Sequence, residues 1–176
     1  ESLLSNDGVF VFEVSYLLDV IKNTYFDNFY HEHISYYSLT ALIPFFKKMN
    51  LEIFDFEHIN THGGSIRVYV GKKDQHKINE EKINKALETE KSFKIEKGLF
   101  FDDFNKKLEN TKNTFIKRFN KLKGKIYGYG APAKTTTFLY YFGIKVDYLI
   151  DDSPLKQGLY SPGLNIPVIK SSALYD

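Results

Sequence analysis

One apolar run near the start of the chain constrains the fold more than any other segment. Residues 8–14 are Gly, Val, Phe, Val, Phe, Glu and Val in that order, directly after Asp7. A run of this length is typical of a strand buried on both faces, as in a parallel sheet. Its Glu13 then lies near the strand end, where α/β proteins bind their ligands. The run therefore favours an α/β architecture.

The pattern that follows extends this architecture. Residues 38–49 have a helical period, with Ser38 as the N-cap and Asn50 as the stop. Their apolar stripe consists of Leu39, Leu42, Ile43, Phe46 and Met49. Residues 51–57 and 65–70 resemble strands, joined by a loop that contains His62, Gly63 and Gly64. A strand, a helix and two strands indicate the closing half of an open α/β sheet.

The middle of the chain favours helices. Residues 74–98 are polar and rich in Lys and Glu, and their apolar residues Ile78, Ile83, Ala86 and Leu87 indicate a surface helix. A second helix is predicted by apolar residues at steps of three, four or seven, and Gly124 is expected to end it. These residues are Phe101, Phe104, Leu108, Phe115, Phe119 and Leu122. We interpret residues 74–122 as a helical connector.

The pattern changes again from residue 125. Residues 125–127 form a short predicted strand, and residues 128–131 a tight glycine loop. Pro132 suits the first position of a helix that ends near Phe142 and Gly143. Residues 146–150 are a second strand, and a further turn precedes residues 166–169. The segment 123–176 is thus a βαβ unit, too small for a complete dinucleotide domain.

The composition excludes several classes of protein. The 176 residues carry a net charge of +2 with basic and acidic residues interspersed, which gives no indication of a nucleic-acid partner. The chain has no Cys, so disulfides and thiolate metal sites are excluded and a reducing compartment fits. No apolar run approaches the length of a membrane span, and residues 1–4 lack the features of a signal peptide. We therefore expect a cytoplasmic protein without a membrane partner.

The densest group of reactive side chains is Tyr30-His31-Glu32-His33. It follows the first predicted strand and precedes the capped helix, which indicates a loop at the ligand edge. Two imidazoles, a carboxylate and a phenol can accept, hold and deliver a proton. A polar surface loop is the alternative. A metal site needs further ligands, and no zinc-binding spacing is present, so we predict no metal here.

The second group is the glycine loop, with Gly128, Gly130 and Lys134. It fits a Gly-x-Gly-x-x-Ala fingerprint with Asp151 at a suitable distance to meet a ribose. It also approaches a P-loop, but Ala133 replaces the second glycine and its Cβ intrudes on the phosphate site. A tight strand-to-helix turn, a sugar-phosphate contact and NAD binding all remain open. For His62-Gly63-Gly64-Ser65 we favour a simple turn, and the loop 151–158 binds a ligand or is solvated.

Taken together, these segments resemble the nucleotide-sugar C-methyltransferases of deoxysugar pathways. The resemblance is carried by five blocks in family order, which span nearly the whole chain: residues 7–14, 30–39, 62–68, 128–134 and 151–158. Where the family has Lys-Gly in the fourth block, this chain has Lys134-Thr135. Family members consist of a zinc-binding N-terminal domain, an S-adenosylmethionine-binding domain and a C-terminal Rossmann-like domain.

The resemblance implies a division of this chain into three parts. Residues 1–73 are the second half of a class I methyltransferase-like sheet, residues 74–122 the helical connector, and residues 123–176 the start of the Rossmann-like domain. The glycine-rich donor loop and the zinc domain then belong to an N-terminal half that is absent, so S-adenosylmethionine binds mostly outside this chain. We expect this fragment alone to be inactive.

The resemblance also implies roles for single residues. The substrate is a nucleotide-linked 4-keto sugar, from which His33 removes the proton next to the ketone, with Glu32 assisting and Tyr30 bonding the substrate oxygen. His31, Gly128, Gly130 and Lys134 are expected to bind the substrate, and Glu13 the methyl donor. An extended strand would place Tyr30 and Glu32 opposite His33, so this assignment requires an irregular loop. An NAD-dependent oxidoreductase fragment and a non-catalytic sugar-nucleotide-binding module remain the alternatives.

Overall fold

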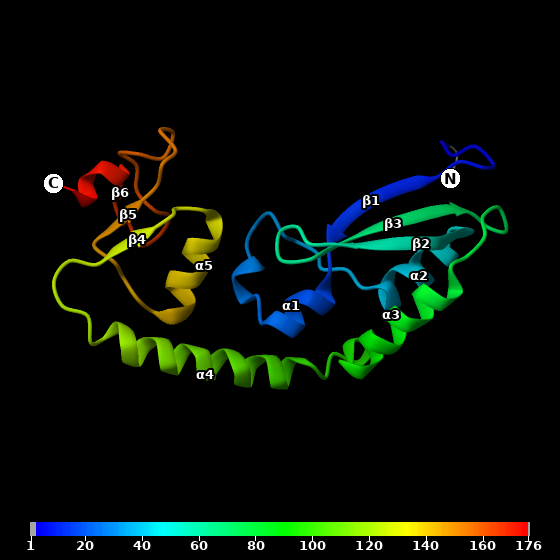
Figure 1. Cartoon of the computed structure of the whole chain (residues 1–176), viewed down its shortest axis with the longest axis horizontal. Coiled ribbons are helices and arrows are strands. Elements are labelled where there is room, and N and C mark those ends of the chain that lie inside the picture. The colour runs from blue at the N-terminus through cyan, green and yellow to red at the C-terminus, as the bar shows by residue number, and fades with distance from the viewer. Residues whose placement is uncertain (1–2, 176) are drawn as a thin grey trace. The chain divides into compact units, whose positions relative to one another are not determined.

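The computed structural model describes residues 3–175, which form two compact units (Figure 1). The first unit contains the residues up to Tyr25 together with Ser35–Lys107. The second contains Phe26–Ile34 together with the residues from Leu108 onward. The chain therefore leaves the first unit for nine residues (26–34) and then returns to it.

The first unit is built on a three-stranded sheet of β1 (Phe10–Ser15), β2 (Leu51–Ile59) and β3 (Ser65–Lys72). The strand order is β1-β3-β2, and both pairings are antiparallel. The three predicted strands are confirmed, but the prediction that the first one is buried on both faces, as in a parallel sheet, is wrong. Phe10 and Val11 are 47% and 46% exposed, because β1 pairs with a neighbour along one edge only in the described residues.

The position of Glu13 also differs from the prediction. The strand continues to Ser15, so Glu13 lies within it rather than at its end. Directly opposite Glu13 in the antiparallel register is Arg67 of β3, whose guanidinium lies 3.0 Å from the Glu13 carboxylate. The antiparallel pairing therefore turns Glu13 into one partner of a cross-strand ion pair.

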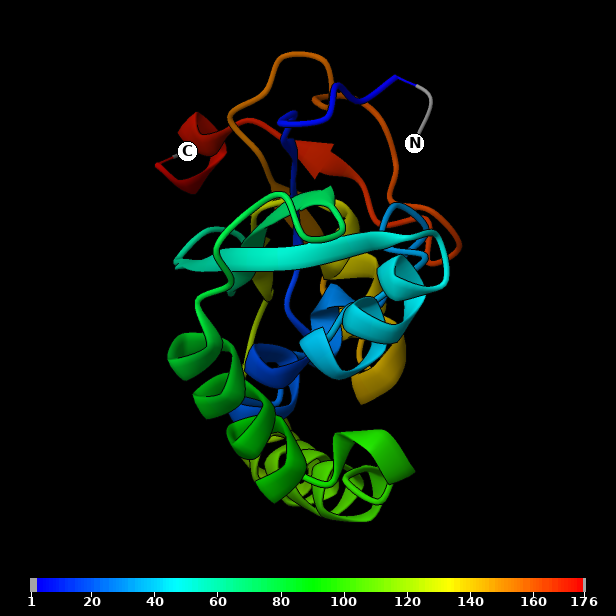
Figure 2. The ribbon, with the colours of Figure 1, turned by 90° about the vertical axis from the view of Figure 1, so that its right-hand side faces the viewer.

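Three helices lie on one side of this sheet: α1 (Leu17–Asn23), α2 (Leu39–Lys47) and α3 (Glu80–Ser92) (Figures 1 and 2). The predicted caps of α2 are confirmed, since the Ser38 hydroxyl accepts from the Ala41 amide and Asn50 has φ of 56°. The core between the sheet and the helices contains Leu39, Leu42, Phe46, Ile66, Val68 and Val70. Helix α1 was not predicted from the sequence.

Helix α3 is exposed on one side and packs its other side on this core. Ile83 is buried, and Glu90 is completely inaccessible to solvent. The Glu90 carboxylate accepts hydrogen bonds of 2.8 Å from the Leu39 amide, the Thr40 amide and the Tyr16 hydroxyl. It therefore supplies acceptors to the first amides of α2, which a helix cannot satisfy by itself. The predicted surface helix is confirmed, and Glu90 adds an internal cap that the sequence did not predict.

The long helix α4 (Phe101–Phe119) follows a short 3₁₀ helix at Ile95–Lys97. The predicted helix is confirmed, although it ends at Phe119, five residues before Gly124. Its residues divide between the two units at Lys107 and Leu108. The predicted connector is therefore shared between the units and does not form a separate part of the described chain.

The second unit is a parallel sheet of β4 (Tyr127–Tyr129), β5 (Tyr148–Ile150) and β6 (Val168–Ile169), in that order. Helix α5 (Ala133–Phe142) connects β4 to β5, which confirms the predicted βαβ unit, and Gly143 ends the helix with φ of 65°. The core contains Leu139, Phe142, Leu149, Ile166 and Val168. Short 3₁₀ helices occur at Phe26–Asn28 and Ser171–Leu174. Among the described residues, no helix is both long and apolar enough to span a bilayer.

Candidate functional site

The segment Tyr30-His31-Glu32-His33 forms a turn. The His33 amide donates to the Tyr30 carbonyl at 2.9 Å, which reverses the chain. The Tyr30 hydroxyl lies 3.0 Å from Nε2 of His33, and the two ring centroids are 4.5 Å apart. The irregular loop that the assignment demanded is therefore present, and it joins the phenol and the imidazole.

The other two side chains of the turn point elsewhere. His31 and Glu32 occupy its corners, with side chains 80% and 67% exposed, and their closest charged atoms are 3.9 Å apart. An ion pair so exposed contributes little to stability. The structure thus brings together Tyr30 and His33, and it places the Glu32 carboxylate beside His31 instead. The predicted roles of all four residues remain predictions.

The turn belongs to the second unit, although the sequence prediction placed it with the first. Two hydrogen bonds attach its loop to α5: Lys134 Nζ donates to Oδ1 of Asn28, and the Thr137 hydroxyl donates to the Phe29 carbonyl at 3.0 Å. The Phe26 ring packs on the rings of Tyr141 and Phe142. Lys134, a predicted substrate ligand, therefore already has a protein partner.

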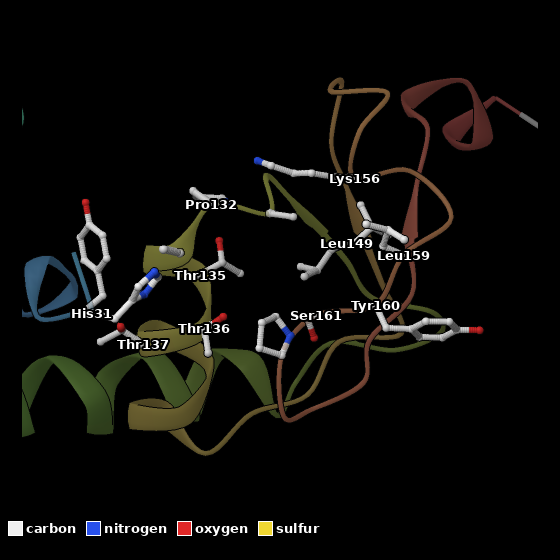
Figure 3. A pocket seen from close by; sticks show the side chains of 15 residues that line it. His31, Pro132, Thr135, Thr136, Thr137, Leu149, Lys156, Leu159, Tyr160 and Ser161 are labelled. Atoms are coloured by element: carbon white, nitrogen blue, oxygen red, sulfur yellow. The ribbon is translucent and has the colours of Figure 1, made fainter.

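A cavity of about 450 Å³ lies beside the turn within the second unit. Figure 3 shows His31 at one end of it, Leu149 and Leu159 at the other, and the α5 threonines between them. Tyr30 lines the cavity and His33 does not. The remaining walls come from the start of α5 and from the loop before β6, and they include Ala131, Pro132, Ala133, Thr135, Thr136, Thr137, Lys156, Tyr160, Ser161, Pro162 and Val168.

Several polar groups of this cavity are already bonded to the protein. The Thr135 hydroxyl donates to the Gly130 carbonyl at 3.1 Å, the Thr137 hydroxyl to Phe29, and the Lys156 ammonium to Asp151 at 3.1 Å. What they present to a ligand is chiefly their apolar surface. A cavity of this size and character suits a small molecule with ring-shaped, uncharged parts.

Two comparisons with known proteins identify the family. Residues 60–176 match the family model described as "C-methyltransferase C-terminal domain". The chain is also similar to the C-methyltransferase NovU of Streptomyces niveus, with 32% identity over 173 residues that cover 95% of this chain. The chain belongs to the C-methyltransferase family. It spans 41% of the length of NovU.

The glycine loop of this C-methyltransferase chain has a structural use. Gly130 has φ of 97°, which favours glycine, and a Cβ at Gly128 would lie 2.9 Å from the Leu149 side chain. Both glycines and Lys134 line an adjoining hollow of about 510 Å³, which shares Pro132, Thr135 and Leu149 with the cavity beside Tyr30. The tight strand-to-helix turn is thus present, and the structure gives no support to direct contact between these glycines and a ligand in the Tyr30 cavity.

Asp151 weakens the NAD interpretation of the same loop. Its carboxylate accepts from the Ala131 amide at 2.8 Å and from the Ser153 amide at 2.9 Å, besides Lys156. These bonds, with that from Ala131 foremost, hold the pKa of Asp151 below its ordinary value. The carboxylate expected to meet a ribose is therefore engaged within the protein, and it occupies an amide at the start of α5 that a pyrophosphate would need.

The first unit gives a different result for Glu13, the predicted donor ligand. One of its carboxylate oxygens accepts from the Thr61 hydroxyl and the other from Arg67, both at 3.0 Å. Both oxygens are thus used within the sheet and its hairpin, which does not favour a contact with the methyl donor. The donor role of Glu13 remains a prediction.

Sequence reasoning missed one polar group in the first unit. His58 Nε2 lies 2.7 Å from the Asp19 carboxylate, and a small pocket of about 280 Å³ adjoins them. The predicted glycine turn is confirmed beside it, where Gly64 has φ of 115° and its absent Cβ would overlap Asp19. The paired glycines predicted the turn, but nothing in the sequence pattern related His58 to Asp19. Within residues 3–175, no group of three His, Asp or Glu side chains is arranged to hold a metal.

Proposed function

We propose that the full-length protein methylates the carbon next to the ketone of a nucleotide-linked 4-keto deoxysugar. Membership of the C-methyltransferase family supports methyl transfer to carbon. The observation that carries the proposal is the contact of 3.0 Å between the Tyr30 hydroxyl and His33 Nε2, at the wall of a cavity large enough for a sugar. Methyl transfer to carbon needs a carbanion equivalent, and a base next to a ketone generates one.

In this proposal the Tyr30–His33 pair removes one proton from the carbon next to the ketone. The C–H bond next to the ketone breaks, the Tyr30–His33 pair takes up the proton, and the electron pair forms an enolate on the ketone oxygen. Tyr30 lines the cavity, so its phenol can donate a hydrogen bond to the developing enolate oxygen or relay the proton to His33. S-adenosylmethionine supplies the methyl group as a sulfonium that the enolate carbon attacks.

The donor site is proposed to lie mostly outside this chain. The chain spans 41% of NovU, and within residues 3–175 the first unit has three strands to contribute to a donor site. We propose that strands of the remaining, N-terminal part pair with the outer edge of β1 and cover its exposed Phe10 and Val11. The zinc that the resemblance implies would also bind in that part. This chain alone is accordingly proposed not to methylate its substrate.

Exchange of the substrate proton with solvent tests the role of the pair. The full-length enzyme is incubated with a 4-keto sugar nucleotide in heavy water, with and without a donor analogue that lacks the methyl group. Wild type should lose the NMR signal of the proton next to the ketone. His33→Ala should slow this loss by about 100- to 10,000-fold, and Tyr30→Phe by a smaller factor.

Two matched variants complete this test. Glu32→Gln should lower the rate only slightly, because its carboxylate lies at an exposed corner of the turn. His62→Asn alters an exposed histidine of the first unit, and Asn tolerates its φ of 50°. Exchange in His33→Ala at the wild-type rate under both conditions would exclude the pair as the base. Tight sugar-nucleotide binding without exchange or methylation would favour the non-catalytic binding module.

A further inference from the structure

One face of α5 carries side chains that the proposed chemistry does not use. Lys134, Thr137, Phe138 and Tyr141 recur at steps of three or four residues, so they lie along one side of the helix. Each of them contacts the segment of the second unit that immediately precedes Tyr30. This face of α5, formed by Lys134, Thr137, Phe138 and Tyr141, therefore supports the segment that leads into the Tyr30–His33 turn, and we call it the seat of that turn.

The polar half of the seat fixes two consecutive residues. Lys134 Nζ donates to Oδ1 of Asn28, and the Thr137 hydroxyl donates to the Phe29 carbonyl at 3.0 Å. Asn28 is only 2% exposed. Because a buried amide costs free energy unless it is hydrogen-bonded, the contact with Lys134 constrains where Asn28 can lie. Tyr30 follows these two anchored residues directly.

The aromatic half of the seat fixes the start of the same segment. The centroid of the Phe26 ring lies 5.1 Å from that of Tyr141, 5.6 Å from that of Phe142 and 6.1 Å from that of Phe138. Aromatic rings at these separations pack favourably. Four residues that end at Phe29 are thus held by apolar contacts at one end and by hydrogen bonds at the other.

We infer that Lys134 and Thr137 are positioning residues for the Tyr30–His33 pair, and that Lys134 does not bind the substrate itself. The inference rests on the proposed function of the pair. Lys134 is not among the residues that line the cavity beside Tyr30, and its ammonium group is engaged by Asn28. Displacing a base by about 1 Å can lower a rate on the order of 100-fold, so loss of these bonds acts on the chemical step.

Kinetics of the full-length enzyme separate positioning from substrate binding. Lys134→Met should lower kcat by about 10- to 100-fold and leave KM for the sugar nucleotide within about 3-fold. Lys134→Arg keeps a cationic donor and should restore most of kcat, and Thr137→Val should cause a smaller loss. Lys123→Met and Thr114→Val change exposed residues of the same unit and should match wild type. Lys134→Gln replaces Lys134→Met if the latter does not fold.

The NMR signals of the His33 ring supply a readout that does not depend on activity. They should shift in Lys134→Met but not in Lys123→Met. If Lys134→Met instead raises KM by about 10-fold or more, retains kcat and leaves the His33 signals unmoved, Lys134 is a substrate ligand and the inference is overturned. Shifted His33 signals in Lys134→Met, combined with a fully active His33→Ala enzyme, support positioning and reject the proposed catalytic role of the pair.

Discussion

Each unit of this chain has one carboxylate that accepts hydrogen bonds from several backbone amides, but the two carboxylates differ in how deeply they are buried. Glu90 in the first unit is fully buried and reaches 51 residues back to the Leu39 amide. Asp151 in the second unit remains partly accessible and reaches 20 residues back to the Ala131 amide. Glu90 caps the first amides of α2, whereas Asp151 holds the glycine loop just before Pro132, the N-cap of α5.

The comparison shows what each helix start is left free to do. In the first unit, Glu90 and Ser38 together satisfy the amides of Leu39, Thr40 and Ala41, so the start of α2 is closed to any ligand. In the second unit, the Asp151 carboxylate accepts from the Ala131 amide, and several residues that follow Ala131 line the cavity beside Tyr30. The first unit thus encloses the start of α2, whereas the start of α5 in the second unit lines the cavity beside Tyr30.

Removal of the deeper carboxylate should have the largest effect. Glu90→Ala leaves the Tyr16 hydroxyl and two amides of α2 buried without acceptors, so we expect a loss of about 3–5 kcal/mol in the free energy of unfolding. Urea denaturation followed by circular dichroism measures it, with Glu88→Ala on the exposed face of α3 as the control. A loss equal to that of Glu88→Ala would mean that the cap of α2 does not depend on Glu90.

Crowding at a glycine of the first unit should have an intermediate effect. Gly64 and Gly143 both have positive φ, but only at Gly64 would a Cβ overlap another group, the Asp19 carboxylate. We expect Gly64→Ala to cost about 2–3 kcal/mol and Gly143→Ala about 1 kcal/mol. The same denaturation experiment compares the pair. Equal costs would show that the contact between the hairpin and Asp19 is not rigid.

The shallower carboxylate should have the smallest effect and a characteristic pH dependence. Because folding lowers the pKa of Asp151, its contribution to stability is complete above the pKa of an unfolded aspartate, about 3.9, and is lost as the pH falls through the lower pKa of the folded state. Asp151→Asn should cost about 1 kcal/mol at pH 7 and nothing at the acidic end. Asp152→Asn is the adjacent exposed control. An unchanged difference at both pH values would contradict this assignment.

Much of the fold was predictable, because its signals are local. The cap at Ser38, the stop at Asn50 and the alternation of β3 each depend on a few neighbouring residues, and all are confirmed. The direction of strand pairing and the burial of Glu90 in α3 were not predictable in the same way. They depend on partners far away in the sequence, such as Arg67 opposite Glu13 and Glu90 on the start of α2.

The sequence predicted that Tyr30–His33 form a loop, but not which part of the chain this loop packs against. The turn at Tyr30–His33 was expected as a loop, and the structure confirms that it is irregular. Its attachment to α5 was missed because Asn28 and Lys134 are 106 residues apart, and no periodic pattern relates them. The role expected of Asp151 changed because a carboxylate 20 residues after a glycine loop can cap the loop itself.

The return of the chain at residues 26–34 also has a consequence for the order of synthesis. A ribosome makes Asn28 first and adds Lys134 only 106 residues later. At about 5–20 residues per second, the segment that carries Tyr30 and His33 waits roughly 5–20 s before its seat on α5 exists. The first unit has all of its strands by then, since β3 ends at Lys72. The reactive pair is therefore assembled late in translation, when the sheet is already complete.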